Sequence, residues 1–129
     1  MVPEVKSHPN WGPRWRRTWL TLGWAWAAAI VWLSLTPSPP TLDFEHSDKL
    51  GHFLAYGGLT FWFCQLYPRA RTRACYAAGF IALGVGMEFL QDMTDYRTFE
   101  VLDMAANTIG VFLGWAAALI LPVAWLRHD

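Results

Sequence analysis

The sequence has no net charge, because ten lysine and arginine residues balance ten aspartate and glutamate residues. A protein that binds nucleic acid or another polyanion needs an excess of positive charge, so this balance argues against such partners. Cysteine is also scarce, with only Cys64 and Cys75 present. Two cysteines do not form a disulfide scaffold, and we expect both to be buried, apolar thiols.

Apolar residues are abundant and make up 54% of the chain, including nine tryptophans. They form four stretches, at about residues 19–35, 51–67, 74–90 and 105–126, each close to the length of about 20 residues that a helix needs to cross a bilayer. Backbone polar groups in hydrocarbon must bond within their own segment, which makes each stretch a helix. A soluble four-helix bundle would need regularly spaced polar residues, and residues 23–33 have none. The prediction is an all-α, polytopic membrane protein with a four-transmembrane-helix bundle.

The predicted membrane domain spans residues 19–126, between a basic and aromatic segment at 1–18 and a short tail at 127–129. Tryptophans alternate with arginines in the first segment, a pattern typical of the lipid head-group layer. A cleaved signal peptide is an alternative interpretation of residues 19–35. That stretch is long for a signal peptide and ends without a clear small-x-small cleavage site, so we expect a retained helix.

Basic residues distinguish the two ends of the predicted bundle. Eight of the ten lysines and arginines precede the first stretch, join the second to the third, or follow the fourth. The positive-inside rule places that side in the cytoplasm. We therefore expect a multi-pass protein of the cytoplasmic (inner) membrane with both termini in the cytoplasm, and with the acidic connections facing outward.

Polar and ionisable residues gather at the outer end of the last three stretches. Such residues are costly inside a bilayer and mark functional sites. Their spacing of three or four residues places each set on one helix face. The sets are Asp48, His52 and Tyr56, then Glu88, Gln91, Asp92 and Asp95, then Asp103 and Asn107. We expect the three sets to converge.

Glu88 follows a wholly apolar segment, residues 77–87, and lies about one turn from the outer end of its stretch. One interpretation is a structural carboxyl that is protonated or paired with His52 or Arg97. The other is a general acid or base tuned by its buried surroundings. The sequence leaves both open.

Residues 110–114 (GVFLG) match the small-xxx-small pattern that lets membrane helices approach closely. Packing within the bundle is the favoured interpretation. A homo-oligomer formed through Gly110 and Gly114 is the alternative.

Four motifs together resemble the VanZ family of small bacterial membrane proteins, over roughly residues 30–115. The motifs are SLTP at 34–37, SDKLGHFLAY at 47–56, EFLQ at 88–91 and RTFEVLDMAANTIG at 97–110, followed by Gly114. The resemblance implies a characteristic polar set: Asp48, Lys49, His52, Tyr56, Glu88, Gln91, Arg97, Asp103 and Asn107. The family usually has glycine where this chain has Tyr96, and often serine where it has Glu100. The founding member is associated with low-level resistance to the glycopeptide teicoplanin.

One functional hypothesis is a membrane enzyme or lipid-handling protein. It would bind or process the head group of a membrane lipid or of a lipid-linked envelope precursor, with a link to glycopeptide tolerance. The candidate catalytic residues are His52, Glu88 and Asp103. The candidate ligand-binding residues are Asp48, Lys49, Tyr56, Gln91, Arg97 and Asn107. We expect no cofactor, because a metal held by His52, Asp48 and Asp103 lacks support from a closely spaced ligand pair such as H-x-x-x-H.

The alternative hypothesis is non-enzymatic. The polar residues would then form a salt-bridged clamp that fixes three helices of a membrane scaffold or partner-binding protein. Proton-coupled transport is disfavoured, because the sequence offers almost only apolar side chains on the cytoplasmic side of Tyr56 and Glu88.

Overall fold

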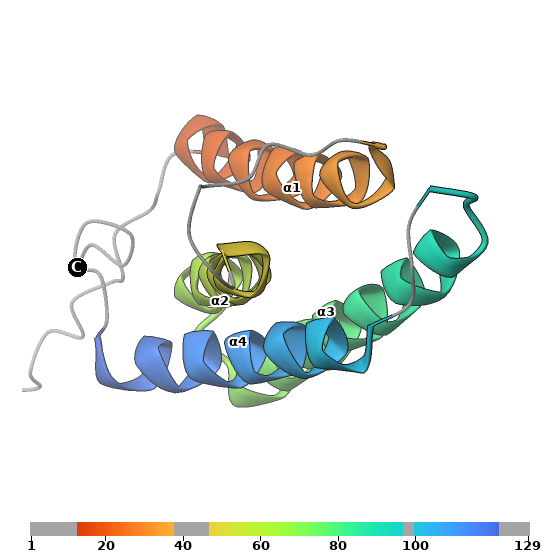
Figure 1. Ribbon diagram of the computed structural model, residues 1–129. Coiled ribbons are helices and arrows are strands. Elements are labelled where there is room, and N and C mark those ends of the chain that lie inside the picture. The colour runs from red at the N-terminus through yellow and green to blue at the C-terminus, as the bar shows by residue number, and fades with distance from the viewer. Residues whose placement is uncertain (1–12, 38–46, 97–99, 122–129) are drawn as a thin grey trace, which may run out of the picture.

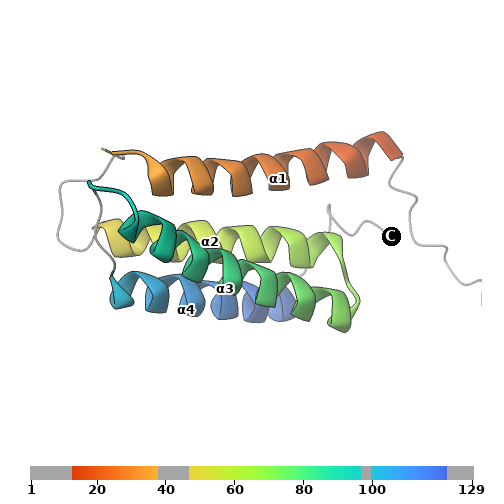
Figure 2. The same cartoon turned by 90° about the vertical axis from the view of Figure 1, so that its right-hand side faces the viewer.

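Four helices make up the described part of the chain (Figure 1). The computed structural model describes residues 13–37, 47–96 and 100–121. Its helices are α1 (Pro13–Leu35), α2 (Ser47–Leu66), α3 (Ala70–Asp92) and α4 (Val101–Ile120), and the described residues contain no strand. Each helix runs opposite to the one before it (Figure 2). The prediction of an all-α, four-helix bundle is confirmed.

The alternating directions give the bundle two chemically different ends. What we call the polar end holds the last turns of α1 and α3 and the first turns of α2 and α4, on the left in Figure 2. What we call the basic end holds the arginines at the start of α1 and around the connection from α2 to α3. The acidic residues of α3 and α4 therefore lie far from most of the arginines.

Three helices, α1, α3 and α4, are long and apolar enough to cross a membrane. Their exposed side chains include Trp32, Phe89 and Leu119. Large apolar side chains of this kind suit a surface in contact with lipid. α2 has the length of α4 but carries Lys49 and His52 within its first turns. It contacts all three other helices and lies among them (Figure 1), so less of its surface faces lipid. The protein is a membrane protein.

The helix limits differ from the apolar stretches by up to about two turns. α1 begins at Pro13, because proline suits the first position of a helix, although the part apolar enough to cross a membrane begins at Arg16. α2 ends before Pro68, and α3 begins at Ala70 after a three-residue connection. Such a short connection forces the two helices to lie antiparallel.

The most extensive helix pair is α2 with α4, and glycines permit its close approach. A Cβ atom at Gly114 would overlap the carbonyl oxygen of Gly57, and one at Gly110 would lie 2.6 Å from that of Phe53. No other residue fits at these positions without movement of the backbone. The small-xxx-small motif thus packs inside the bundle. A homo-oligomer through the same glycines stays a prediction.

α1 is tied to the other helices at the polar end through its last carbonyl groups. The Gln91 side-chain amide donates to the Ser34 carbonyl oxygen at 2.7 Å, and the Tyr96 hydroxyl donates to that of Leu35 at 2.7 Å. The final carbonyls of a helix have no partner within the helix. α3 and the turn that follows it supply those partners.

At the basic end, arginines bind the carbonyl end of α2. The Arg73 Nε donates to the carbonyl oxygens of Cys64 and Tyr67, both at 2.9 Å, and Arg73 is buried. The Arg16 guanidinium lies 4.9 Å from the centre of the Tyr67 ring. Positive charge at a helix C-terminus is stabilising, so these arginines contribute to the fold as well as to charge asymmetry.

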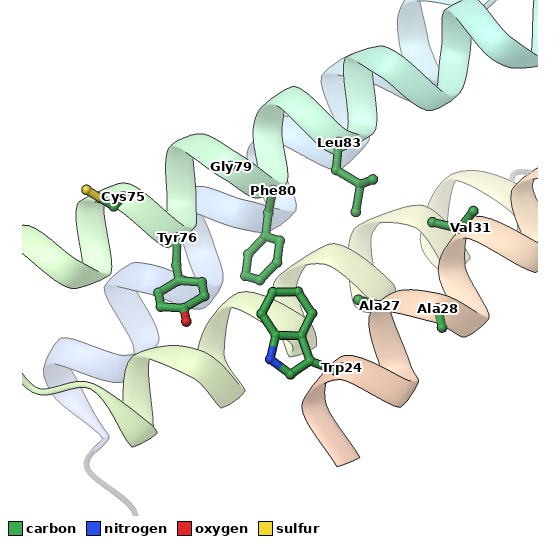
Figure 3. A pocket seen from close by; sticks show the side chains of 9 residues that line it. All are labelled: Trp24, Ala27, Ala28, Val31, Cys75, Tyr76, Gly79, Phe80 and Leu83. Carbon is green, nitrogen blue, oxygen red and sulfur yellow. The ribbon is translucent and has the colours of Figure 1, made fainter. Parts of the chain in front are cut away.

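Cys64 is buried and Cys75 is exposed. The expectation of two buried thiols is therefore wrong for Cys75. This residue borders an apolar hollow of about 610 Å³ between α1 and α3 (Figure 3). The Trp24 indole reaches from α1 toward Phe80 of α3 within that hollow. Its lining is almost wholly apolar, which suits a surface within hydrocarbon.

Substitution at Gly114 tests the close contact of α2 with α4. Gly114→Ala should lower the free energy of unfolding by about 1–3 kcal/mol, because the added methyl group overlaps a backbone carbonyl that is held by its own helix. Thermal unfolding of the purified protein in detergent, followed by circular dichroism, measures the change. Gly86→Ala is the matched control, since a Cβ there meets nothing within 4 Å. Equal melting temperatures for both variants would contradict the contact.

Candidate functional site

Three ionisable side chains from three helices meet at the polar end. They are His52 of α2, Glu88 of α3 and Asp103 of α4, and we call them the central cluster. One nitrogen or oxygen atom from each lies within 4.8 Å of the corresponding atoms of the other two. The expected convergence of the three polar sets therefore occurs for these residues, because α2 and α4 begin where α3 ends.

Contacts on both ring nitrogens orient His52. Its Nδ1 lies 2.9 Å from Asn107 Oδ1, and its Nε2 lies 3.7 Å from Asp103 Oδ2. An amide oxygen can only accept, so Nδ1 carries a proton and donates it to Asn107. In the neutral imidazole, Nε2 then carries no proton, and its lone pair is free on the side of the ring near Asp103. Gly84 leaves room for Asn107, since a Cβ there would lie 3.1 Å from Asn107 Cβ.

Lys49 carries positive charge to the outer side of the central cluster. Its Nζ lies 2.7 Å from Asp103 Oδ1 and 2.5 Å from Glu100 Oε2. An ammonium group so placed compensates part of the negative charge of the site. Lys49 is one of the candidate ligand-binding residues, and an anionic head group that bound to it would have to compete with these two carboxylates.

Glu88 is the deepest member of the central cluster, with 1% of its surface exposed. Its Oε2 accepts a hydrogen bond from the backbone N–H of Glu100 at 3.2 Å. Its Oε1 is buried and has no hydrogen-bond partner among the described residues. The Tyr56 hydroxyl is buried and without a partner there as well, and it lies near enough to interact electrostatically with Glu88. Unpaired buried groups are rare in native proteins, so these two atoms need an explanation.

Some residues of the three predicted polar sets do not join the central cluster. Gln91 is buried, but its amide is bound to the end of α1 and serves the packing of α1 on α3. Asp92 and Asp95 are exposed. The side chain of Asp48 and the whole of Arg97 lie outside the described residues, so their binding roles and the pairing of Arg97 with Glu88 stay predictions.

Glu100 belongs to the site, although sequence reasoning noted it only as a departure from the family. It precedes the first residue of α4, its carboxylate binds Lys49, and its backbone N–H binds Glu88. The sequence signal that points to Glu100 is its spacing of three residues from Asp103, since residues three apart share a helix face.

Sequence comparison links the whole bundle to known proteins. The sequence pattern that defines the VanZ/LLP1 family matches residues 15–122, which include all of the central cluster. The chain belongs to the VanZ/LLP1 family. The predicted resemblance is thereby confirmed, and the match begins within α1 and extends just beyond α4.

An uncharacterised protein of the yeast Schizosaccharomyces pombe is 33% identical to this VanZ/LLP1 chain over 92 residues. The alignment covers 69% of this chain and 54% of the yeast protein, so the chain spans about half the length of that relative. The chain is therefore similar to a eukaryotic protein. No solved structure matches the chain.

A double-mutant cycle tests the ion pair between Lys49 and Asp103. Lys49→Met alone should cost about 1–3 kcal/mol of unfolding free energy, because it leaves two carboxylates without their ammonium partner. Adding Asp103→Asn should recover part of that loss, since only one carboxylate then remains uncompensated. Unfolding of all variants in detergent gives the coupling energy. The control cycle combines Lys49→Met with Asp92→Asn, which neutralises an exposed carboxylate. In that cycle the two changes in unfolding free energy should be additive. Additivity in both cycles would contradict the ion pair.

Proposed function

We propose that this VanZ/LLP1 protein binds or processes the head group of a membrane lipid, or of a lipid-linked envelope precursor, at the polar end of its bundle. In this proposal the central cluster supplies acid–base groups, and Lys49, Tyr56 and Asn107 surround the bound group. The proposal extends to a contribution to glycopeptide (teicoplanin) tolerance in the cytoplasmic membrane.

The observation that carries the proposal is the pair of buried, unpartnered atoms, Glu88 Oε1 and the Tyr56 hydroxyl. A cluster with a purely structural role would pair these groups, because unpaired polar atoms away from water cost free energy. A head-group hydroxyl could donate to the carboxylate and accept from the phenol at once. Such a ligand would satisfy both atoms.

In this proposal the head group approaches these atoms from the less buried side of the site. Side-chain exposure increases from 10% at Asp103 to 21% at Lys49 and 44% at Glu100. All of these residues lie near the starts of α2 and α4, where the lipid head groups of one leaflet would be. A head group could therefore reach the site while its acyl chains stay in the bilayer.

A structural clamp is the second candidate function, and the Lys49 contacts favour it. Lys49 joins α2 to Glu100 and Asp103, and His52 joins α2 to Asn107, so these polar contacts tie α2 and α4 together. Buried ion pairs often specify geometry rather than add stability. In that case the protein would act as a scaffold for a partner.

Glu88→Gln and His52→Ala should separate the two candidates. Both variants should accumulate in the membrane at normal levels, since the amide oxygen introduced by Glu88→Gln can still accept from the Glu100 N–H. Teicoplanin tolerance of cells that depend on the protein should fall to the level of cells without it. Growth over graded teicoplanin concentrations and immunoblots of membranes provide the two measurements.

Asp92→Asn is the control for this pair, because it neutralises an exposed carboxylate one turn from Glu88. It should change neither abundance nor tolerance. If Glu88→Gln and His52→Ala fail to accumulate while Asp92→Asn does, the clamp is the better description. Full tolerance in cells that carry Glu88→Gln would remove the acid–base role.

The proposed orientation places the basic end in the cytoplasm and the polar end at the outer leaflet. In a variant with Cys64→Ala and Cys75→Ser, a cysteine introduced by Asp95→Cys should react with a membrane-impermeant maleimide on intact cells. A cysteine introduced by Arg71→Cys should react only after the membrane is permeabilised. Both positions are exposed in the structure, so access depends on the side of the membrane. The opposite labelling pattern would reverse the orientation.

A further inference from the structure

We propose that the central cluster binds a divalent transition-metal ion, such as Mn²⁺ or Zn²⁺, and that this ion coordinates a phosphate of the head group. The protein ligands are His52 Nε2, Asp103 Oδ2 and Glu88 Oε1. The proposed binding of a phosphate rests on the proposed function, whereas the metal site rests on the geometry of the three residues.

The spacing of the ligand atoms suits a metal better than a direct ion pair. His52 Nε2 and Asp103 Oδ2 are 3.7 Å apart, longer than a hydrogen bond. Two ligands bound tetrahedrally at roughly 2.0–2.2 Å from one ion lie about 3.3–3.6 Å apart. Glu88 completes the set, because one oxygen of its carboxylate lies within 4.8 Å of a ligand atom of each of the other two residues. Small side-chain rotations would bring all three into coordination.

Each ligand is anchored through its other polar atom. Asn107 accepts from Nδ1 of His52, the Glu100 N–H donates to Oε2 of Glu88, and Lys49 binds Oδ1 of Asp103. Anchors of this kind orient metal ligands and select the imidazole tautomer whose free nitrogen can coordinate. The atoms left over are the three that we assign to the ion.

Burial and charge supply independent support. Glu88 is 1% exposed and its Oε1 has no partner in the described part of the chain, as expected for a ligand atom. Among the described side chains of the site, the carboxylates of Glu88, Glu100 and Asp103, when ionised, exceed the charge of Lys49 by two. A dication cancels that excess, and uncompensated charge at this depth is costly.

The donor set and the surroundings indicate which ion and which ligand fit. One imidazole and two carboxylates suit Zn²⁺, Mn²⁺ or Fe²⁺. Three protein ligands leave coordination positions open, as in catalytic metal sites. A bound dication also neutralises the negative charge of the cluster, so a phosphate oxygen can take one of the open coordination positions. The Tyr56 hydroxyl would donate a hydrogen bond beside it.

Mn²⁺ titration of the full chain in detergent, after removal of metals with EDTA, tests the site. Loss of the free Mn²⁺ signal in electron paramagnetic resonance should show one ion per chain. Glu88→Gln and Asp103→Asn should each weaken binding about ten-fold or more. Asp92→Asn is the matched control and should bind as the parent does. No saturable binding by the parent protein, or equal affinity in Glu88→Gln, would overturn the metal site.

A measurement on the unaltered protein covers the case in which the variants do not fold. Pulsed electron paramagnetic resonance of the bound Mn²⁺ should detect the nitrogen of one coordinated imidazole. His52→Ala should remove that signal. A bound ion that shows no imidazole nitrogen would overturn the assignment of His52.

Glycerol 1-phosphate serves as the probe for the head group. Its ³¹P resonance should be broadened by the Mn²⁺-loaded parent protein and not by Mn²⁺-treated Glu88→Gln. Tight Mn²⁺ binding without broadening of the ³¹P resonance would overturn phosphate binding and would leave the metal site supported. Binding of the probe in EDTA that is lost in Glu88→Gln would instead support head-group binding and overturn the metal.

Discussion

The close packing of α2 against α4 determines how the polar end is built. Successive contacts with α2 follow one another along α4 at intervals of about one turn. They are Gly114 with Gly57, Gly110 with Phe53, Asn107 with His52 and Asp103 with Lys49. Since the contacts share one register, the glycines that let the backbones approach also set the distances of the polar pairs. A larger side chain at either glycine of α4 would therefore move the site as well as weaken the bundle.

The ends of the other helices follow from the need to pair carbonyl groups near a membrane. The last carbonyls of α1 receive hydrogen bonds from Gln91 and Tyr96, and those of α2 receive them from Arg73. Water is scarce at this depth, so a helix end without such donors would be costly. Residues that look like ligands or topology signals in the sequence therefore serve helix termination.

The central cluster combines anchored atoms with free ones. Lys49 and Asn107 hold one side of Asp103 and of His52, which stabilises the geometry. Glu88 and Tyr56 each keep a buried polar atom that nothing in the described residues satisfies. Rigid anchoring on one side and unsatisfied atoms on the other is the arrangement that a binding site needs, because a preformed site loses little entropy when it binds.

The sequence by itself determined the helices, because the length of an apolar run and the cost of unpaired backbone groups in lipid leave few alternatives. Helical spacing also identified His52, Glu88 and Asp103, since residues three or four apart share a face. Only the tertiary structure decided which face meets which. It assigned Gln91 to the end of α1, exposed Cys75 and brought in Glu100, because periodicity defines a face without naming the neighbour that covers it. The distances within the cluster, which decide its chemistry, depend on how closely α2 and α4 approach, and that is a property of the packed bundle.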